Sequence, residues 1–172
     1  QINLMMGRRH KVKEEAKTVM DLMMNGGASA VFHGMSEDDV KRIMLYPFNM
    51  FASDASIRVL NAGMPHPRGY GTNARVLSKY VREEKVLSLE EAIRRMTSLP
   101  ALKFQLKDRG LLREGYAADI VIFDEKEVQD LSTFDRPHAY SKGFVVVIVN
   151  GVLTVENGQH LGTRAGQALR RQ

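Results

Sequence analysis

Apolar residues in the N-terminal part of the chain follow a helical pattern in two places. Between Val12 and Met24 they recur at the spacing of one helix face, and the pattern ends at Gly26. A second helix is predicted to begin after Ser36, an N-cap residue followed by acids, and to close at Pro47. The sequence therefore opens with two amphipathic helices.

Each of these helices is followed by a short apolar run. Residues 28–32 and 48–52 lack helical spacing and are the length of a strand, so both are predicted to be buried strands. Helix and strand in alternation are typical of a parallel sheet with helical crossovers. An eight-unit barrel needs about 200 residues or more, so this α/β part is expected to be the closing portion of a larger domain.

The middle of the chain continues in helices. Apolar spacing predicts one helix over residues 73–84 and another over residues 88–96, and the second opens with the capping-box pair Ser88 and Glu91. Pro100 interrupts the pattern, and residues 101–106 are predicted to add one further turn.

From Gly110 the pattern changes to strands and turns. Residues 116–123, 144–149 and 152–155 are predicted strands, and Asn150-Gly151 between the last two is a strong hairpin signal. The boundary is therefore placed so that residues 1–108 form the α/β part and residues 109–172 form a small β unit.

Composition excludes several classes of function. The chain has 172 residues with a net charge of +5, but its basic residues are mixed with acidic ones, which is typical of solvated helix faces and not of a nucleic-acid surface. No nucleic-acid partner is therefore expected. No apolar run approaches the length of a membrane span, so no membrane partner is expected either. Cysteine is absent, which removes disulfides and thiolate metal ligands and is compatible with a cytoplasmic protein.

Candidate chemistry gathers after the second predicted strand. Asp54 follows that strand directly, and the next loop carries His66, Arg68 and Tyr70. In α/β barrels, catalytic groups lie at the carboxyl ends of strands, so Asp54 is the first candidate for acid–base work and Arg68 for binding a carboxylate. Ser53-Asp54 is also a common way to start a turn or cap a helix, and a loop arginine often bonds nearby carbonyls.

Other catalytic classes lack their motifs. The five histidines form no compact metal-binding pair, so local spacing assembles no zinc site. No serine elbow, P-loop or dinucleotide-binding glycine pattern is present.

Several motifs, in order, resemble the C-terminal third of the D-aminoacylases, which are N-acyl-D-amino-acid deacylases of the metal-dependent amidohydrolase superfamily. The motifs are Ser53-Asp54, His66-Pro67-Arg68-Gly69-Tyr70-Gly71-Thr72, Met96-Thr97-Ser98-Leu99-Pro100-Ala101, Ala118-Asp119-Ile120-Val121 and Val149-Asn150-Gly151. The resemblance implies the closing part of a (β/α)8 TIM-type barrel in residues 1–108, followed by a small β-sandwich segment in residues 109–172.

The resemblance also implies roles for individual residues. Asp54 matches the aspartate that activates the hydrolytic water and protonates the departing amine, and it could make a weak metal contact. Arg68 matches the arginine that binds the substrate α-carboxylate, while His66, Tyr70 and Ser53 have supporting roles. No other metal ligand falls in this chain, because the family's zinc ligands lie upstream of the matched region.

The implied activity is metal-dependent hydrolysis of the amide bond of a small-molecule N-acyl-D-amino acid. The chain is expected to need the remainder of the barrel, from the same polypeptide or from another chain, and to be inactive alone. Two alternatives stay open: a non-catalytic β-rich binding module, and an amidohydrolase for cyclic amides of the hydantoinase or dihydroorotase type. An upstream His-x-His segment would favour the enzyme over the module.

Overall fold

The computed structural model describes residues 12–27 and 34–170, and the chain divides into two compact units, Gln1–Gly34 and Met35–Gln172. In the first unit the predicted helix is confirmed as α2 (Val12–Met24). It ends where predicted, because Gly26 and Gly27 have positive φ angles of 96° and 78°. The strand predicted over residues 28–32 lies outside the described residues.

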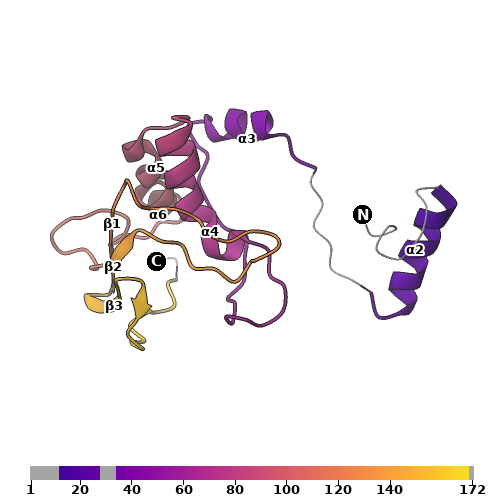
Figure 1. Ribbon diagram of the computed structural model, residues 1–172. Coiled ribbons are helices and arrows are strands. Elements are labelled where there is room, and N and C mark those ends of the chain that lie inside the picture. The colour runs from indigo at the N-terminus through magenta and orange to yellow at the C-terminus, as the bar shows by residue number, and fades with distance from the viewer. Residues whose placement is uncertain (1–11, 28–33, 171–172) are drawn as a thin grey trace. The chain divides into compact units, whose positions relative to one another are not determined.

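The second unit begins with helices, shown in purple to magenta tones in Figure 1. They are α3 (Glu37–Met44), α4 (Arg68–Arg75), the π-helix η1 (Val76–Glu83), α5 (Leu89–Met96) and α6 (Ser98–Lys103). The caps predicted for α3 and α5 are confirmed: Ser36 accepts a hydrogen bond from the Asp39 amide, and Ser88 accepts one from the Glu91 amide. The turn predicted over residues 101–106 begins earlier, at Ser98, because Pro100 fits within the first turn of a helix, where its missing N–H is not needed.

The helix predicted over residues 73–84 differs from the prediction at its start and in its second half. It begins at Arg68, so Arg68 and Tyr70 lie on the first turn of α4 and not in a loop. Gly71 serves close packing here, since a Cβ on it would lie 2.8 Å from the Cβ of Asp130. The second half is a π-helix, in which the Glu84 amide bonds to the Lys79 carbonyl at 2.8 Å.

The strand predicted over residues 48–52 is wrong. This segment is irregular, Phe48 is 72% exposed, and the Phe51 amide donates to the Arg95 carbonyl at the end of α5. A strand needs a hydrogen-bonded neighbour along its length, and within the described ranges no strand pairs with this segment.

The only sheet within residues 12–27 and 34–170 is antiparallel, with the order β1-β2-β3-β4. Its strands are β1 (Ile120–Phe123), β2 (Phe144–Val149), β3 (Val152–Glu156) and β4 (Gln159–His160). The hairpin turn between β2 and β3 is confirmed, with φ angles of 48° at Asn150 and 79° at Gly151. The predicted strand over residues 116–123 is shorter, since a turn closed by the Tyr116 amide on the Arg113 carbonyl precedes it.

Asp119, just before β1, bonds to the hairpin turn between β2 and β3. Its Oδ1 accepts a hydrogen bond from the Asn150 amide at 2.8 Å, and its Oδ2 accepts one from Arg109. Arg109 also donates to the Asn150 side chain at 3.0 Å. This aspartate therefore fixes the hairpin turn and has a structural role.

The core lies between the helices and the sheet. Its buried residues come from α3, α4, η1, α5, the connection between η1 and α5, and the segment after β1, where Val128 is fully buried. Arg95 of α5 is also buried, at 3% exposure; its guanidinium donates to the Met44 and Tyr46 carbonyls at the end of α3 and to Glu91. It thereby joins α3 to α5.

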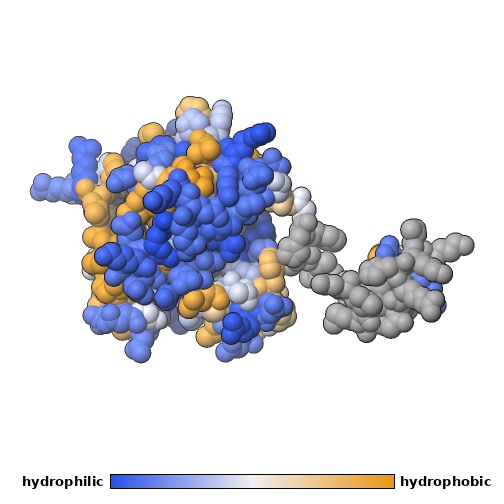
Figure 2. Space-filling model, turned by 45° about the horizontal axis from the view of Figure 1, so that its top comes forward, coloured by the Kyte–Doolittle hydropathy of each residue, from blue (hydrophilic) through white to orange (hydrophobic). Residues whose placement is uncertain are grey.

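The surface of the second unit carries scattered apolar groups. Figure 2 shows apolar patches along the left edge of this unit. The exposed apolar residues of the chain include Leu112, Val121 and Ile122. Among the residues that the structure describes, no helix is long and apolar enough to cross a membrane.

A pH effect is expected at Glu91. The hydrogen bonds from Arg94, at 2.7 Å, and Arg95, at 2.6 Å, lower the pKa of Glu91 from 4.5 to about 2. Because the folded-state pKa lies below the unfolded value, these bonds stabilise the fold fully above about pH 4.5, and the contribution is lost as the pH falls toward 2.

Urea unfolding midpoints of the chain and of Glu91→Gln, measured at several pH values, check this expectation. The difference between the two proteins should be largest above pH 4.5 and should shrink as the pH falls toward 2. A difference that stays constant over this range would contradict it.

Candidate functional site

Asp54 and Arg68 form an ion pair. The Arg68 Nη2 lies 2.9 Å from the Asp54 Oδ2, and the two side chains are 45% and 86% exposed. Asp54 sits in the irregular segment before the loop, with a left-handed backbone (φ 47°) that aspartate tolerates better than most residues. The structure thus brings together the two residues that the sequence singled out first.

His66 lies just before α4 and completes its N-terminus. The N-cap position is Pro67, which makes no side-chain cap, and the His66 Nδ1 accepts a hydrogen bond from the Arg68 amide at 3.1 Å. The imidazole also packs edge-on against Phe134, with 5.0 Å between ring centroids. His66 therefore holds the backbone of Arg68 in place.

Tyr70 lies on the first turn of α4, and residues far along the chain contact it. Its hydroxyl lies 3.1 Å from the His138 Nδ1, and its ring packs edge-on against those of His138 and Tyr140. The Ser141 hydroxyl donates to the Tyr70 carbonyl at 3.0 Å. These contacts fix both the side chain and the backbone of Tyr70.

A pocket of about 510 Å³ opens beside α4. It is lined by three of the five predicted site residues, Ser53, Arg68 and Tyr70, together with other residues of α4, residues just before β2 and residues of the sheet from β2 to β4. Asp54 reaches this group through its ion pair with Arg68, whereas His66 contacts the Arg68 backbone. All five predicted residues thus lie in or next to this pocket. Ser53, Arg68 and Tyr70 line it, and Asp54 and His66 contact Arg68 from outside the lining.

The segment 129–142, called here the arm, was missed by sequence reasoning. It leaves β1 and returns to β2 past α4, and appears in orange in Figure 1. Its base is closed by the pairing of Gln129 with Lys142, and Asp130 forms an ion pair with Arg75 of α4 at 3.0 Å. Partial burial alone would lower the pKa of Arg75, but the Asp130 carboxylate raises it above its ordinary value. The signal available in the sequence was the length of this connection, since long loops in compact domains are often functional.

The described residues do not by themselves provide a metal centre. Within ranges 12–27 and 34–170, no group of three His, Asp or Glu side chains lies close enough together to hold a metal ion. The five predicted site residues supply one carboxylate, one guanidinium, one imidazole and two hydroxyls, which suit proton transfer and carboxylate binding.

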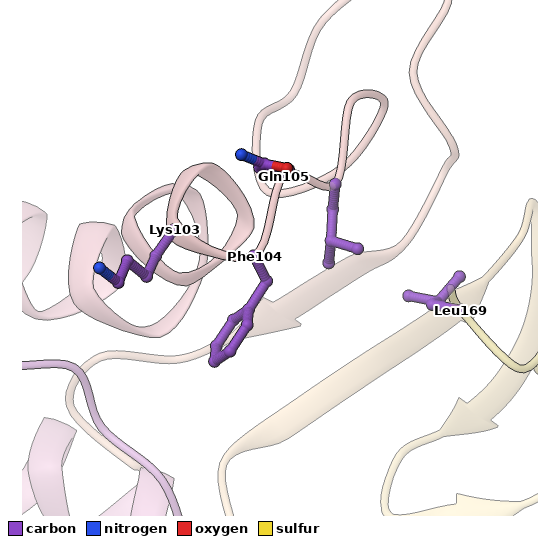
Figure 3. A pocket seen from close by; sticks show the side chains of 5 residues that line it. Lys103, Phe104, Gln105 and Leu169 are labelled. Carbon is purple, nitrogen blue, oxygen red and sulfur yellow. The ribbon is translucent and has the colours of Figure 1, made fainter. Parts of the chain in front are cut away.

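A second cavity, of about 650 Å³, lies at the end of α6. Figure 3 shows Lys103, Phe104, Gln105 and Leu169 around it. With Leu106 they make up its lining, which contains no acidic residue and no histidine. It therefore lacks the groups for acid–base chemistry that the site beside α4 has.

Comparison with known proteins gives concordant matches. The model of the amidohydrolase family matches residues 7–155. The chain is 43% identical over 143 residues to the N-acyl-D-aspartate deacylase of Alcaligenes xylosoxydans xylosoxydans, and the match covers 83% of this chain and 28% of that protein.

Two solved structures are also similar. One is a D-aminoacylase described as defining a novel subset of amidohydrolases, with a TM-score of 0.74, 40% identity, and coverage of 80% of this chain and 28% of that one. The other is the N-acyl-D-glutamate deacylase of Bordetella bronchiseptica with zinc and a phosphonate inhibitor. Its TM-score is 0.71 and its identity 43%, and the match covers 79% of this chain and 28% of that one. The chain thus spans 28% of the length of these relatives. The family match over residues 7–155, together with these likenesses, places the chain in the amidohydrolase family.

Proposed function

We propose that this chain forms part of a metal-dependent deacylase of N-acyl-D-amino acids. The observation that carries the proposal is the Asp54–Arg68 ion pair at 2.9 Å, beside a pocket that Ser53 and Tyr70 help to line. The similar proteins act on N-acyl-D-aspartate and N-acyl-D-glutamate, by their names, which supports an acylated D-amino acid as substrate.

Asp54 is proposed to move the proton. Amide hydrolysis forms a bond between water oxygen and the acyl carbon, breaks the carbon–nitrogen bond and transfers a proton to the leaving nitrogen. A carboxylate can accept that proton from the water and donate it to the nitrogen. Asp54 is suited to this because it is exposed and its only charged partner among the described residues is Arg68.

Arg68 is proposed to bind the substrate α-carboxylate. Its guanidinium already holds one carboxylate, that of Asp54, and a guanidinium is a planar fork that matches such groups. A substrate carboxylate competing for this fork would release Asp54 from its ion pair. Substrate binding and the freeing of the base are thereby linked.

The metal is proposed to be zinc, which the similar N-acyl-D-glutamate deacylase contains. Since the described residues hold no three-ligand cluster, its ligands are proposed to come from other parts of the enzyme, with Asp54 at most a weak contact. Residues 1–108 are then the closing part of a TIM-type barrel and residues 109–172 a β-sandwich segment. The partially exposed Val121 and Ile122 of β1 are consistent with further strands packing there. A cytoplasmic location remains a prediction.

A chimaera tests the proposed function. In it, this chain replaces the matching portion of the N-acyl-D-aspartate deacylase, so that the relative supplies the rest of the enzyme. The zinc-loaded chimaera should release D-aspartate, D-glutamate or another D-amino acid from its N-acetyl derivative, whereas the chain alone and the L-substrates should give no product. A folded, zinc-loaded chimaera that hydrolyses only dihydroorotate, or nothing, would contradict the proposal.

Arg68→Lys should weaken substrate binding in the chimaera. Lysine keeps the charge but loses the two-point geometry, so KM should rise by a factor of about 10 to 100, with a smaller change in kcat. Steady-state kinetics on the best N-acetyl-D-amino acid would measure this. Arg42→Gln, which changes an exposed arginine of α3, is the control and should behave as the parent. An unchanged KM in Arg68→Lys would exclude Arg68 as the carboxylate-binding group.

A further inference from the structure

We propose that His138 is a positioning residue of this site, through which the arm (residues 129–142) holds the loop between Asp54 and Arg68. The imidazole contacts both the middle of that loop and the first turn of α4. The effect on turnover rests on the proposed function, whereas the docking of the loop does not.

Three hydrogen bonds of His138 carry the proposal. The Asn61 amide donates to its Nδ1 at 3.1 Å, its Nε2 lies 2.8 Å from the Gly63 carbonyl, and the Tyr70 hydroxyl lies 3.1 Å from the Nδ1. A backbone amide can only donate and a carbonyl can only accept, so the proton is on Nε2 and Nδ1 is the acceptor. The Tyr70 hydroxyl therefore donates, and only the neutral Nε2–H tautomer satisfies all three partners.

The arm is built to hold this imidazole in place. Just before His138, the buried Ser132 donates to the Pro137 carbonyl at 2.6 Å, and the Thr133 amide donates to the Arg136 carbonyl at 3.1 Å. Directly after the arm, Gly143 approaches the backbone of Val128, the residue directly before the arm, so closely that a Cβ on Gly143 would lie 2.4 Å away. His138 is thus presented from a folded turn that is anchored to the core.

The loop needs such an anchor. Residues 54–67 form no helix or strand, and Asn61 and Gly63 have positive φ angles of 63° and 67°. Asp54 stands at one end of this segment, and Arg68 directly follows the other. The middle of the loop and Tyr70 of α4 both bond to the His138 imidazole. These bonds restrict how the Asp54 carboxylate and the Arg68 guanidinium move relative to each other. A misplacement of about 1 Å at a reacting group can cost on the order of a hundredfold in rate.

Two variants separate the halves of this contact. In His138→Asn the amide oxygen can take the place of Nδ1 and accept from Asn61 and Tyr70, but the bond to Gly63 is lost. In His138→Gln the longer side chain can donate to Gly63 in the place of Nε2 and loses the acceptor. His138→Ala loses both. Arg136→Ala, an exposed residue of the same arm, is the matched control.

The first test uses the chain itself and needs no activity. The ¹⁵N spectrum of the histidines should show His138 with its proton on Nε2, and the Asn61 amide should exchange with solvent at least tenfold faster in His138→Ala than in the parent. In His138→Asn the Asn61 amide should keep part of its protection from exchange. In Arg136→Ala it should exchange as slowly as in the parent. A rapid average of both tautomers, or Asn61 exchange that does not change in His138→Ala, would overturn the proposal.

The second test uses the zinc-loaded chimaera. His138→Ala should lower kcat/KM by about ten- to a hundredfold at unchanged zinc content, with a rise in KM, and His138→Asn should recover part of it. If the parent chimaera is active and His138→Ala matches Arg136→Ala, the inference fails while the proposed function stands. If the chimaera is inactive but the Asn61 protection depends on His138, the proposed function fails while the docking of the loop stands.

Discussion

Asp54→Asn is expected to lower kcat of the zinc-loaded chimaera by about a thousandfold, the scale of a lost general acid–base group. Asparagine is nearly the same size, and its amide oxygen can still accept a hydrogen bond from Arg68. The side chain can no longer take a proton from water, so the chemical step should fail while the fold is kept. Steady-state kinetics, with zinc content and thermal unfolding measured on the same samples, would check this.

The matched control is Asp135→Asn, which changes an exposed aspartate of the arm and should leave kcat within about twofold of the parent, as expected for surface substitutions. Should Asp54→Asn keep more than a tenth of the parent turnover, Asp54 would not be the base. Its carboxylate would then serve only to hold Arg68.

Arg95→Met should have the largest effect on stability, about 3 to 5 kcal/mol in the free energy of unfolding. The Arg95 side chain is almost completely buried and donates to the Met44 and Tyr46 carbonyls and to Glu91. Methionine can fill the space but supplies no donor, so the Met44 carbonyl and the Glu91 carboxylate would each lose the hydrogen bond from Arg95, and the Tyr46 carbonyl would keep only the bond from the Asn49 amide. Urea unfolding of the chain, followed by circular dichroism, measures the change.

The neighbouring arginine provides the comparison. Arg94 also bonds to Glu91 and reaches the Pro47 carbonyl, but its side chain is 40% exposed. Arg94→Met is therefore expected to cost no more than about 1 kcal/mol, the range of exposed ion pairs. Equal losses from the two variants would show that burial of Arg95 does not decide its contribution.

The parts of the fold that depend on neighbours in sequence could be predicted. The caps at Ser36 and Ser88 bond to amides three residues ahead, and the Asn150-Gly151 turn needs only residues that accept positive φ angles. The start of α4 could not, because Gly71 reads as a helix breaker unless its packing against Asp130 is known. The strand predicted over residues 48–52 failed for a similar reason: its apolar character says nothing about whether a neighbouring strand is available.

The site divides in the same way. Asp54 and Arg68 could be singled out because chemistry-bearing residues cluster around one loop, and the structure brings them within 2.9 Å of each other. His138 could not, because its partners Asn61, Tyr70 and Gly63 lie 77, 68 and 75 residues away in the sequence. A lone histidine after a proline has no local pattern that points to such distant contacts.

The arm has a consequence for how such proteins exchange parts during evolution. The loop with Asp54 precedes the sheet in the chain, whereas His138, which holds that loop, lies between β1 and β2. Recombination between two relatives at the junction of helices and sheet would join the loop of one parent to the arm of the other. Such hybrids would keep every residue proposed to touch substrate but would lose contacts between the loop and the arm. We therefore expect the loop and the arm to be inherited together.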